Sequence, residues 1–251
     1  MTLFDTFRRY LDEEIPVALA TRLTGEHVGA KLLVRLDGSA EGDLGDAGLT
    51  ERVRIEARDL LRAGTTETRA YDMPGGLTEV FIESFPVPPR LLIVGATGAA
   101  GPLATFGQAL GYRVIIVDAR AAFADPARYP DADRVLKGWP QDVLPGLRLD
   151  ESTYVVLLSH DPKFDEPTLD EVLPSPVPYI GAIGSRKTQR ERFERLRAKG
   201  YSEEQLSRIY GPVGLDLGGR SAEETALAIL AEITAVRYGA EGGFMRRRLA
   251  G

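Results

Sequence analysis

The pattern of hydrophobic and polar residues predicts a small α/β domain in the first third of the chain. Apolar residues recur at helical spacing over 3–14 and 51–63, which indicates two amphipathic helices. Three segments have the apolar or alternating character of strands: 17–21, 31–36 and 78–85. We therefore expect helices and strands to pack together over residues 1–86.

The pattern changes after Pro86-Val-Pro-Pro89, a stiff connector. The expected strands beyond it are unbroken apolar runs at 91–94, 113–117, 154–158 and 179–180. The expected helices are 101–110, 167–173, 186–198 and a last one from the capping box Ser221–Glu224 to a stop at Gly239. Apolar strands between helices indicate a parallel sheet covered on both faces. We expect a Rossmann-like, doubly wound sheet in residues 90–239, then a basic C-terminal tail, 240–251.

The first of these strands runs into a glycine-rich loop with Gly95, Gly98 and Gly101, and the next strand ends in Asp118. Glycines let the backbone approach a pyrophosphate, and the following helix N-terminus supplies free N–H groups. An acid at the second strand's end is placed to accept ribose hydroxyls. The pattern predicts a dinucleotide site, with Thr97 also in contact. The alternative is a tight strand–helix turn without a ligand.

Two residues bear on whether the dinucleotide is NAD or NADP. Asp118 favours NAD, because its carboxylate would accept both ribose hydroxyls and repel a 2′-phosphate. Arg120 could offset that repulsion and admit NADP. The sequence leaves the two open.

Composition and charge narrow the functions. The chain has 251 residues, a formal net charge of −6 and no apolar run near the length of a membrane span, so neither nucleic acid nor a membrane is an expected partner. The N-terminus lacks a signal-peptide core, and we expect a cytoplasmic protein. Cysteine is absent and only His27 and His160 are present, which excludes thiolate catalysis, cysteine-ligated zinc and iron–sulfur sites, and metal sites with three or more histidines. No metal site is expected.

A polar loop follows the strand 154–158, at the sheet edge where ligands of such folds bind. In it, His160 or Asp161 could move a proton, and Lys163 could stabilise an anion. The alternative is a loop in which Asp165 caps the next helix and Lys163 makes an exposed ion pair.

Two further segments are candidates. Gly184, Ser185 and Arg186 combine a glycine turn, a helix start and a fork-shaped cation, which is the form of an anion site. The alternative is Ser185 as a plain helix cap. The glycine-rich loop 210–220 could present Asp216 or Arg220 to a ligand or a partner, or could simply be a structural turn.

These motifs together resemble the xanthine dehydrogenase accessory (XdhC/CoxI) family. The resemblance rests on the glycine loop with Asp118 and on the segments 159–165, 179–186 and 211–218, with looser matches at 16–21, 29–34 and 75–83. It implies a small N-terminal α/β domain, a Rossmann-type domain and a homodimer. It also implies maturation of molybdenum hydroxylases: binding molybdenum cofactor, helping its sulfuration and delivering it. The implied partners are the apo-hydroxylase and a cysteine desulfurase.

The chain departs from the family at its cysteines. Family members typically carry one cysteine in the segment that here reads 42–51, and a second where this chain has Pro74. The family histidine before Gly-Pro is Tyr210 here. Molybdenum cofactor therefore cannot be held through a protein thiol, and no molybdenum bound through protein sulfur is expected, because methionine is a poor ligand for that centre.

Three functions follow. The first is a family-type accessory protein for a molybdenum hydroxylase. The second is an NAD(P)H-dependent oxidoreductase on the same fold, with Tyr210 as a proton donor. The third is a nucleotide-sensing or interaction protein without chemistry. A homodimer is expected in addition, because the apolar helix face Leu3, Phe4, Phe7 and Leu11 needs cover.

Overall fold

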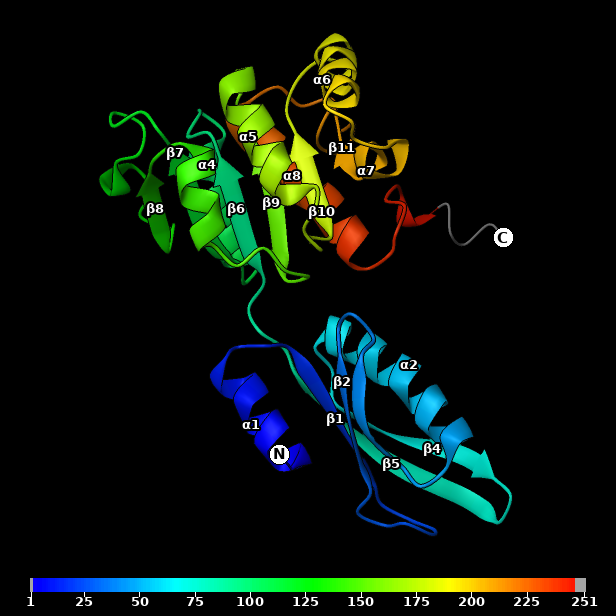
Figure 1. The fold of residues 1–251 in the computed structure, drawn as a ribbon. Coiled ribbons are helices and arrows are strands. Elements are labelled where there is room, and N and C mark those ends of the chain that lie inside the picture. Colours follow the sequence, from blue (N-terminus) through cyan, green and yellow to red (C-terminus); the bar gives the residue numbers. More distant parts are fainter. Residues whose placement is uncertain (1, 247–251) are drawn as a thin grey trace. The chain divides into compact units, whose positions relative to one another are not determined.

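The computed structural model describes residues 2–246, and the chain divides into two compact units after Val87 (Figure 1). Residues 247–251 of the predicted basic tail lie outside the described residues. None of the helices in the described range combines the length and apolar character needed to span a bilayer.

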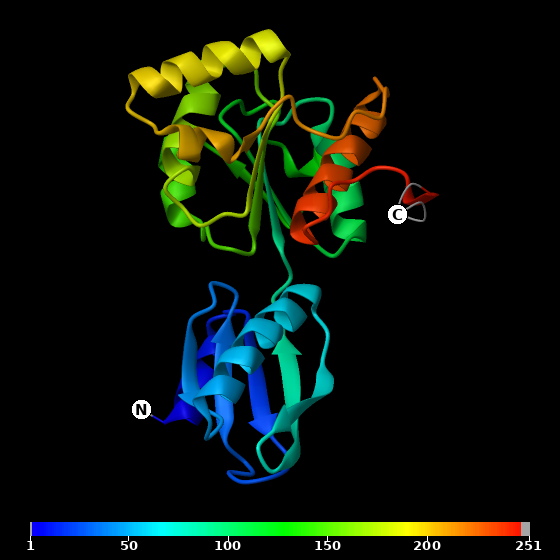
Figure 2. The same cartoon turned by 90° about the vertical axis from the view of Figure 1, so that its right-hand side faces the viewer.

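The N-terminal unit is a five-stranded antiparallel sheet with a helix against each face. Its elements are α1 (Leu3–Asp12), β1 (Val17–Arg22), β2 (Lys31–Arg35), β3 (Ala40–Asp43), α2 (Ala47–Ala63), β4 (Glu67–Met73) and β5 (Gly76–Phe85), in the sheet order β3-β2-β1-β5-β4. Because side chains alternate along a strand, Ala18 and Ala20 of β1 pack with α2, while Val17 packs on the other face with Tyr10 of α1. Figure 2 shows α2 crossing its face of the sheet.

The apolar face of α1 is divided between the chain's own core and solvent. Leu3 and Phe7 pack within the unit, where the Phe7 ring meets Phe85 edge-on at 5.0 Å. Phe4 and Leu11 remain 69% and 42% exposed. The face that motivated a homodimer is therefore smaller than the sequence suggests, and the dimer stays a prediction.

The C-terminal unit is a six-stranded parallel sheet between two layers of helices, which confirms the predicted Rossmann-like fold. Its strands are β6 (Arg90–Val94), β7 (Arg113–Asp118), β8 (Arg134–Lys137), β9 (Thr153–Leu157), β10 (Tyr179–Ala182) and β11 (Ile209–Tyr210), in the order β11-β10-β9-β6-β7-β8. Its helices are α3 (Ala100–Ala109), α4 (Pro140–Val143), α5 (Pro162–Val172), α6 (Arg186–Ala198), α7 (Glu203–Ser207) and α8 (Ala222–Arg237), with 3₁₀ turns at Pro126–Arg128 and Leu144–Gly146.

The helices of this unit bury both faces of the sheet, as Figure 2 shows. On one face, Leu91 and Ile93 of β6 and the side chains beside them pack with α3 and α8. Leu92, Val94 and the opposite face pack with α5, α6 and α7. The strand order reverses at β6, which pairs with β7 on one side and β9 on the other. Ligands of open α/β sheets bind outside the carboxyl ends of the strands at such a switch point.

Two helices begin earlier than the hydrophobic pattern predicts. Asp46 caps α2 by accepting from the N–H of Leu49, so this helix begins at Ala47 rather than at Glu51. Asp161 caps α5 by accepting from the N–H of Lys163, so the prolines in this helix do not delay its start. The alternative in which Asp165 caps this helix is therefore wrong, because Asp161 is the cap.

Asp165 instead lies inside α5, in a buried ion pair. Its carboxylate is 2.7 Å from Nη2 of Arg192 on α6, whose side chain is 1% exposed. Arg192 also donates to Gln189 and to the carbonyl of Ile183, just past β10. The pair thus joins α5 and α6 to the loop that carries Gly184.

Removing one partner of this pair should leave a buried charge without compensation. We expect Arg192→Met to lower the free energy of unfolding by about 3–5 kcal/mol, the usual cost of breaking a buried pair. Urea unfolding followed through Trp139, the single tryptophan, measures this in the C-terminal unit. Arg190→Met, on the exposed side of α6, is the matched control and should change stability little. Equal stability of the two variants would contradict the assignment.

Candidate functional site

The glycine loop after β6 is shaped by a close approach between two chain segments. Gly95 has φ +97°, and a Cβ built there would lie 3.0 Å from the backbone N of Ser159, after β9. Only glycine meets both conditions without strain. Gly95 N–H donates to the carbonyl of Val117 at 2.9 Å, so the loop starts at the junction of β6, β7 and β9.

The helix that follows the loop, α3, has an open N-terminus. Its N-cap, Ala99, makes no side-chain hydrogen bond. Gly98 is exposed, and a Cβ added at Gly98 or Gly101 would meet no heavy atom within 4 Å. Thr97 is half-buried beside them. Uncapped N–H groups and the positive end of the helix dipole suit an anion here.

Asp118, at the end of β7, is fully buried and accepts four hydrogen bonds. Oδ1 accepts from the backbone N–H of Arg120 and from its Nε, both at 2.9 Å. Oδ2 accepts from Nη2 of Arg120 at 2.7 Å and from the N–H of Ala96 at 2.8 Å. Burial alone raises the pKa of Asp118, but the donors of Arg120 and Ala96 outweigh it and hold the pKa below its ordinary value.

Aromatic rings surround the Asp118–Arg120 pair. The Arg120 guanidinium lies 4.1 Å from the centre of the Phe123 ring and 5.7 Å from that of Phe164. Arg128 approaches the same Phe123 ring at 5.3 Å. Trp139 and Phe164 are 4.9 Å apart, and Trp139 is 40% exposed. Cations and aromatic surfaces thus meet at this end of the sheet.

The polar loop after β9 lies at the same edge, but its polar groups are partly committed to structure. Asp161 caps α5, and its own N–H donates to Ser159 Oγ at 3.0 Å. His160 and Lys163 are exposed. The role of Asp161 as a helix cap is compatible with a ligand site here, because the cap still leaves His160 and Lys163 exposed at the carboxyl end of β9.

The segment after β10, next along this edge of the sheet, also combines a helix cap with an exposed charged side chain. Ser185 caps α6 by accepting from the N–H of Thr188 at 3.1 Å. Gly184 has φ +138°, where a Cβ would lie 3.0 Å from the Thr188 side chain. Arg186, the first residue of α6, is exposed. Ser185 thus caps α6, and the exposed Arg186 remains available to an anion.

Tyr210 lies on β11, stacked on Tyr179 with ring centres 4.8 Å apart. Tyr179 in turn donates to Glu232 of α8 at 2.6 Å. Among residues 2–246, no hydrogen bond joins Tyr210 to His160, Asp161 or Lys163. In the loop after Tyr210, Asp216 and Arg220 are exposed, and the N–H of Arg220 donates to Glu224.

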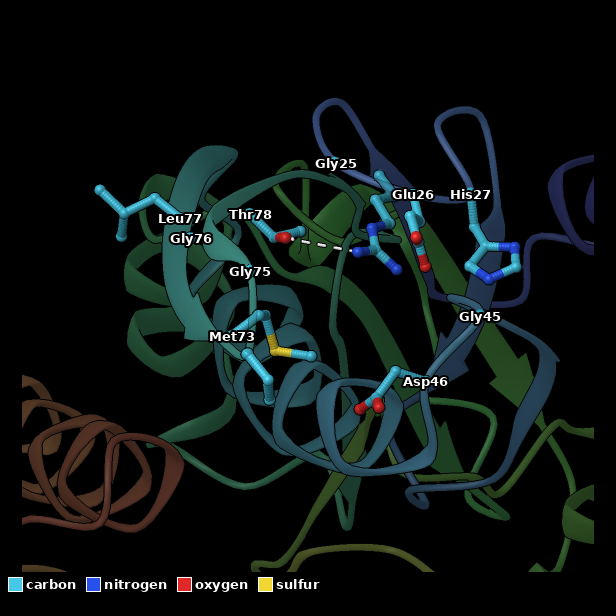
Figure 3. A pocket seen from close by; sticks show the side chains of 12 residues that line it. Gly25, Glu26, His27, Gly45, Asp46, Met73, Gly75, Gly76, Leu77 and Thr78 are labelled. Atoms are coloured by element: carbon cyan, nitrogen blue, oxygen red, sulfur yellow. Dashed lines mark hydrogen bonds between the residues drawn. The ribbon is translucent and has the colours of Figure 1, made fainter.

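A cavity of about 520 Å³ in the N-terminal unit was not predicted from the sequence (Figure 3). Three loops form it: the β1–β2 loop with Glu26 and His27, the segment before α2 with Gly45 and Asp46, and the β4–β5 turn with Gly75 and Gly76. The two segments in which family members carry cysteines, 42–51 and Pro74, thus meet at one cavity. The positions of the two family cysteines were therefore the sequence signal that could have located this cavity.

Buried Arg22 forms one wall of this cavity and ties the loops together. It donates to the carbonyls of Thr24 and Leu44 and to Thr78 Oγ1, the last drawn in Figure 3. The ring of His27 packs against Gly45, where a Cβ would lie 2.4 Å from it. The lining therefore offers one buried cation, an imidazole, two carboxylates and the backbone of several glycines.

The fold, the glycine loop and the N-terminal cavity define a two-domain protein. It has a Rossmann unit and a smaller unit that contains the cavity. Family models agree over most of the chain: residues 91–233 match the XdhC Rossmann domain, and residues 11–72 match the XdhC and CoxI family. The chain belongs to the XdhC family.

Relatives and a solved structure are consistent with this assignment. The chain is 27% identical over 98% of its length to the uncharacterized protein YqeB of Escherichia coli, covering 48% of that protein. It is 29% identical to a protein of Bacillus subtilis described as a probable subunit of xanthine dehydrogenase (64% of this chain, 46% of the relative). It is 31% identical to the molybdenum cofactor insertion chaperone PaoD of E. coli (59% of this chain, 40% of the relative). The chain thus spans about half the length or less of these relatives.

A crystal structure from Bacillus halodurans, described as a xanthine dehydrogenase, shares the fold. It covers 99% of this chain with a TM-score of 0.54 at 19% identity.

The Asp118 carboxylate should stabilise the C-terminal unit in a pH-dependent manner. We expect Asp118→Asn to cost about 1–3 kcal/mol near pH 7, because Ala96 and Arg120 lose a charged acceptor. Since folding lowers the Asp118 pKa, its contribution is complete above the ordinary carboxyl pKa and is lost as pH falls through the lower folded value. The difference in unfolding free energy between wild type and variant should therefore shrink below about pH 4.

Urea titrations of both proteins across this pH range test the prediction. Asp216→Asn, an exposed acid in the same unit, is the control and should show no such difference. A wild-type to Asp118→Asn difference that is constant with pH would contradict the assigned hydrogen bonds.

Proposed function

We propose that this chain is an accessory factor in the maturation of a molybdenum hydroxylase of the xanthine dehydrogenase type. It takes up molybdenum cofactor as cargo and delivers it to the apoenzyme, while its glycine loop binds a nucleotide. The observation that carries the proposal is the match of both units to XdhC family models, together with the similarity to a cofactor insertion chaperone.

The cavity of the N-terminal unit is the proposed cargo site. Its volume of about 520 Å³ lies within the usual range for small-molecule sites. Arg22 and His27 offer donors, and Glu26 and Asp46 offer acceptors, which suits a pterin because its ring carries both kinds of group. The chain has no cysteine, so these contacts hold the cargo through hydrogen bonds and charge rather than through sulfur.

The absence of a thiol also limits what the protein does to its cargo. A chain without cysteine cannot relay sulfur as a persulfide. Sulfuration would then require direct access of a cysteine desulfurase to the bound cofactor. The partners in this proposal are that desulfurase, the apo-hydroxylase and a second copy of the chain.

The nucleotide site is proposed from the geometry of the glycine loop. Gly95 permits the close turn, α3 has no capping side chain, and the space over Gly98 and Gly101 is open. These features fit the pyrophosphate of a dinucleotide such as NAD or NADP. When bound, such a cofactor would supply a hydride, and the chain's own groups would orient it.

A reductase acting on a small molecule is less well supported than the accessory role. Within residues 2–246, Tyr210 stacks on Tyr179 and has no hydrogen bond to the loop after β9. Tyr210, the proton donor of that alternative, is thus not joined to Asp161 and Lys163 in one hydrogen-bonded cluster. The geometry favours binding and delivery over chemistry.

Cargo binding should depend on the N-terminal cavity. We expect the purified chain to retain molybdenum cofactor through gel filtration and to increase the activity of an added apo-hydroxylase. Pro74→Trp should reduce both, because the indole fills the cavity. Pro145→Trp, at an exposed proline of the other unit, is the control. Retention is measured by the fluorescence of the oxidised pterin, and absence of retention and of activation by the wild type would refute the proposal.

Nucleotide binding should depend on the glycine loop. Gly98→Trp should abolish calorimetric binding of adenine dinucleotides, because the indole covers the open N-terminus of α3. Gly146→Trp is the control, since a Cβ there also meets no atom within 4 Å and the residue precedes β9 rather than following a strand. Equal binding by Gly98→Trp and wild type would place the nucleotide elsewhere.

A further inference from the structure

We infer that the nucleotide at the glycine loop carries a phosphate on the 2′-oxygen of its adenosine ribose, as NADP(H) does and NAD(H) does not. The inference rests on the proposed nucleotide site and specifies its ligand. It reverses the preference for NAD that the sequence position of Asp118 suggests.

The first step concerns the capacity of Asp118 to accept ribose hydroxyls. A carboxylate has about four lone-pair positions, and here two donors meet each oxygen. Three of these donors belong to Arg120 and one to Ala96. Asp118 is fully buried beneath them. A ribose diol could reach this carboxylate only by displacing the Arg120 side chain.

The second step concerns what holds Arg120 in place. Its guanidinium contacts Asp118 through Nε and Nη2 in a two-pronged pair, and one face lies 4.1 Å from the centre of the Phe123 ring. Displacement would break both the ion pair and the cation–ring contact. Asp118 therefore acts as a positioning residue that fixes the orientation of a cation.

The third step concerns the donors that remain. A guanidinium has five N–H donors, and Asp118 takes two from the Arg120 side chain. The remaining N–H donors of the Arg120 guanidinium have no hydrogen-bond acceptor among residues 2–246. The Arg120 side chain is 47% exposed, so these donors are open to solvent at the end of β7 and available to a ligand. A phosphate accepts such a fork, whereas a hydroxyl pair accepts it poorly.

The surrounding charges support the same ligand. Arg128 lies against the same Phe123 ring as Arg120, and the exposed Lys137 is the register partner of Asp118 on β8. The charge of Asp118 is buried and neutralised, and the exposed acid that acts on Arg120 is Asp161. Arg120, Arg128 and Lys137 are therefore three exposed cations near the end of β7, and they suit a ligand with an additional phosphate.

The test compares ligands that differ only in the 2′-phosphate. Calorimetry measures the affinity of the intact chain for adenosine 2′,5′-bisphosphate and adenosine 5′-monophosphate, and for NADPH and NADH. Fluorescence of Trp139, beside Phe164, reports the same binding events. We expect the 2′-phosphorylated member of each pair to bind at least about tenfold more tightly, the effect of one good charged contact.

Arg120→Ala should reverse this preference. The variant loses the cation and uncovers the Asp118 carboxylate, which then accepts ribose hydroxyls and repels a 2′-phosphate. The matched control is Arg197→Ala, because Arg197 makes a similar two-pronged pair with Glu203 and is 48% exposed, on α6. The control should retain the wild-type preference.

The outcomes separate this inference from the proposal beneath it. Preference for the 2′-phosphorylated ligands, reversed in Arg120→Ala alone, supports it. Equal or tighter binding of NADH and adenosine 5′-monophosphate by the wild type overturns the inference and leaves the nucleotide site intact. Failure of every nucleotide to bind at millimolar concentration removes the nucleotide site, and this inference with it, while cargo binding in the N-terminal cavity is unaffected.

Discussion

The C-terminal unit depends on one close contact, at the point where the sheet changes direction. Gly95 lets the loop after β6 pass within van der Waals distance of the chain leaving β9, while its N–H bonds to the end of β7. The Asp118 carboxylate then bonds to Ala96, the next residue of that loop. A side chain at Gly95 would push β6 away from β9 and move Ala96 from Asp118. The course of the glycine loop, the orientation of Arg120 and the open start of α3 all follow from this packing.

The strands that the sequence predicted are those in the middle of the sheets, and the ones it did not predict are the edges. β3, β4, β8 and β11 are the outermost strands of the two sheets, and no hydrophobic pattern marked them. An edge strand has one neighbour and little burial: every residue of β3 is exposed, and β4 buries only Tyr71. Burial is what imposes an apolar pattern on a strand. Edge strands form because a neighbour offers hydrogen bonds, and a single sequence does not record that.

The candidate sites were predictable to the extent that they depend on local sequence. The glycine loop, Asp118 and the capped start of α6 are each contained within a few residues, and the pattern located them. The state of Asp118 depends on which way the side chain of Arg120 turns, and the pairing of Asp165 joins α5 to α6. The N-terminal cavity depends on three loops that are separated in sequence by strands and a helix. Such arrangements are set by packing, which spacing along the chain does not describe.

The edges of the N-terminal sheet restrict how this chain can associate with others. β3 carries Glu41 and Asp43 around Gly42, whose φ is +92°, and β4 carries Glu67, Arg69 and Asp72. Charges and a kinked backbone on edge strands discourage the pairing of sheets from two molecules. A continuous sheet across two copies, and the fibrous growth that open edges permit, are thereby disfavoured. Self-association through this unit would have to use side chains, and Phe4 and Leu11 of α1 are among the apolar residues that the unit exposes.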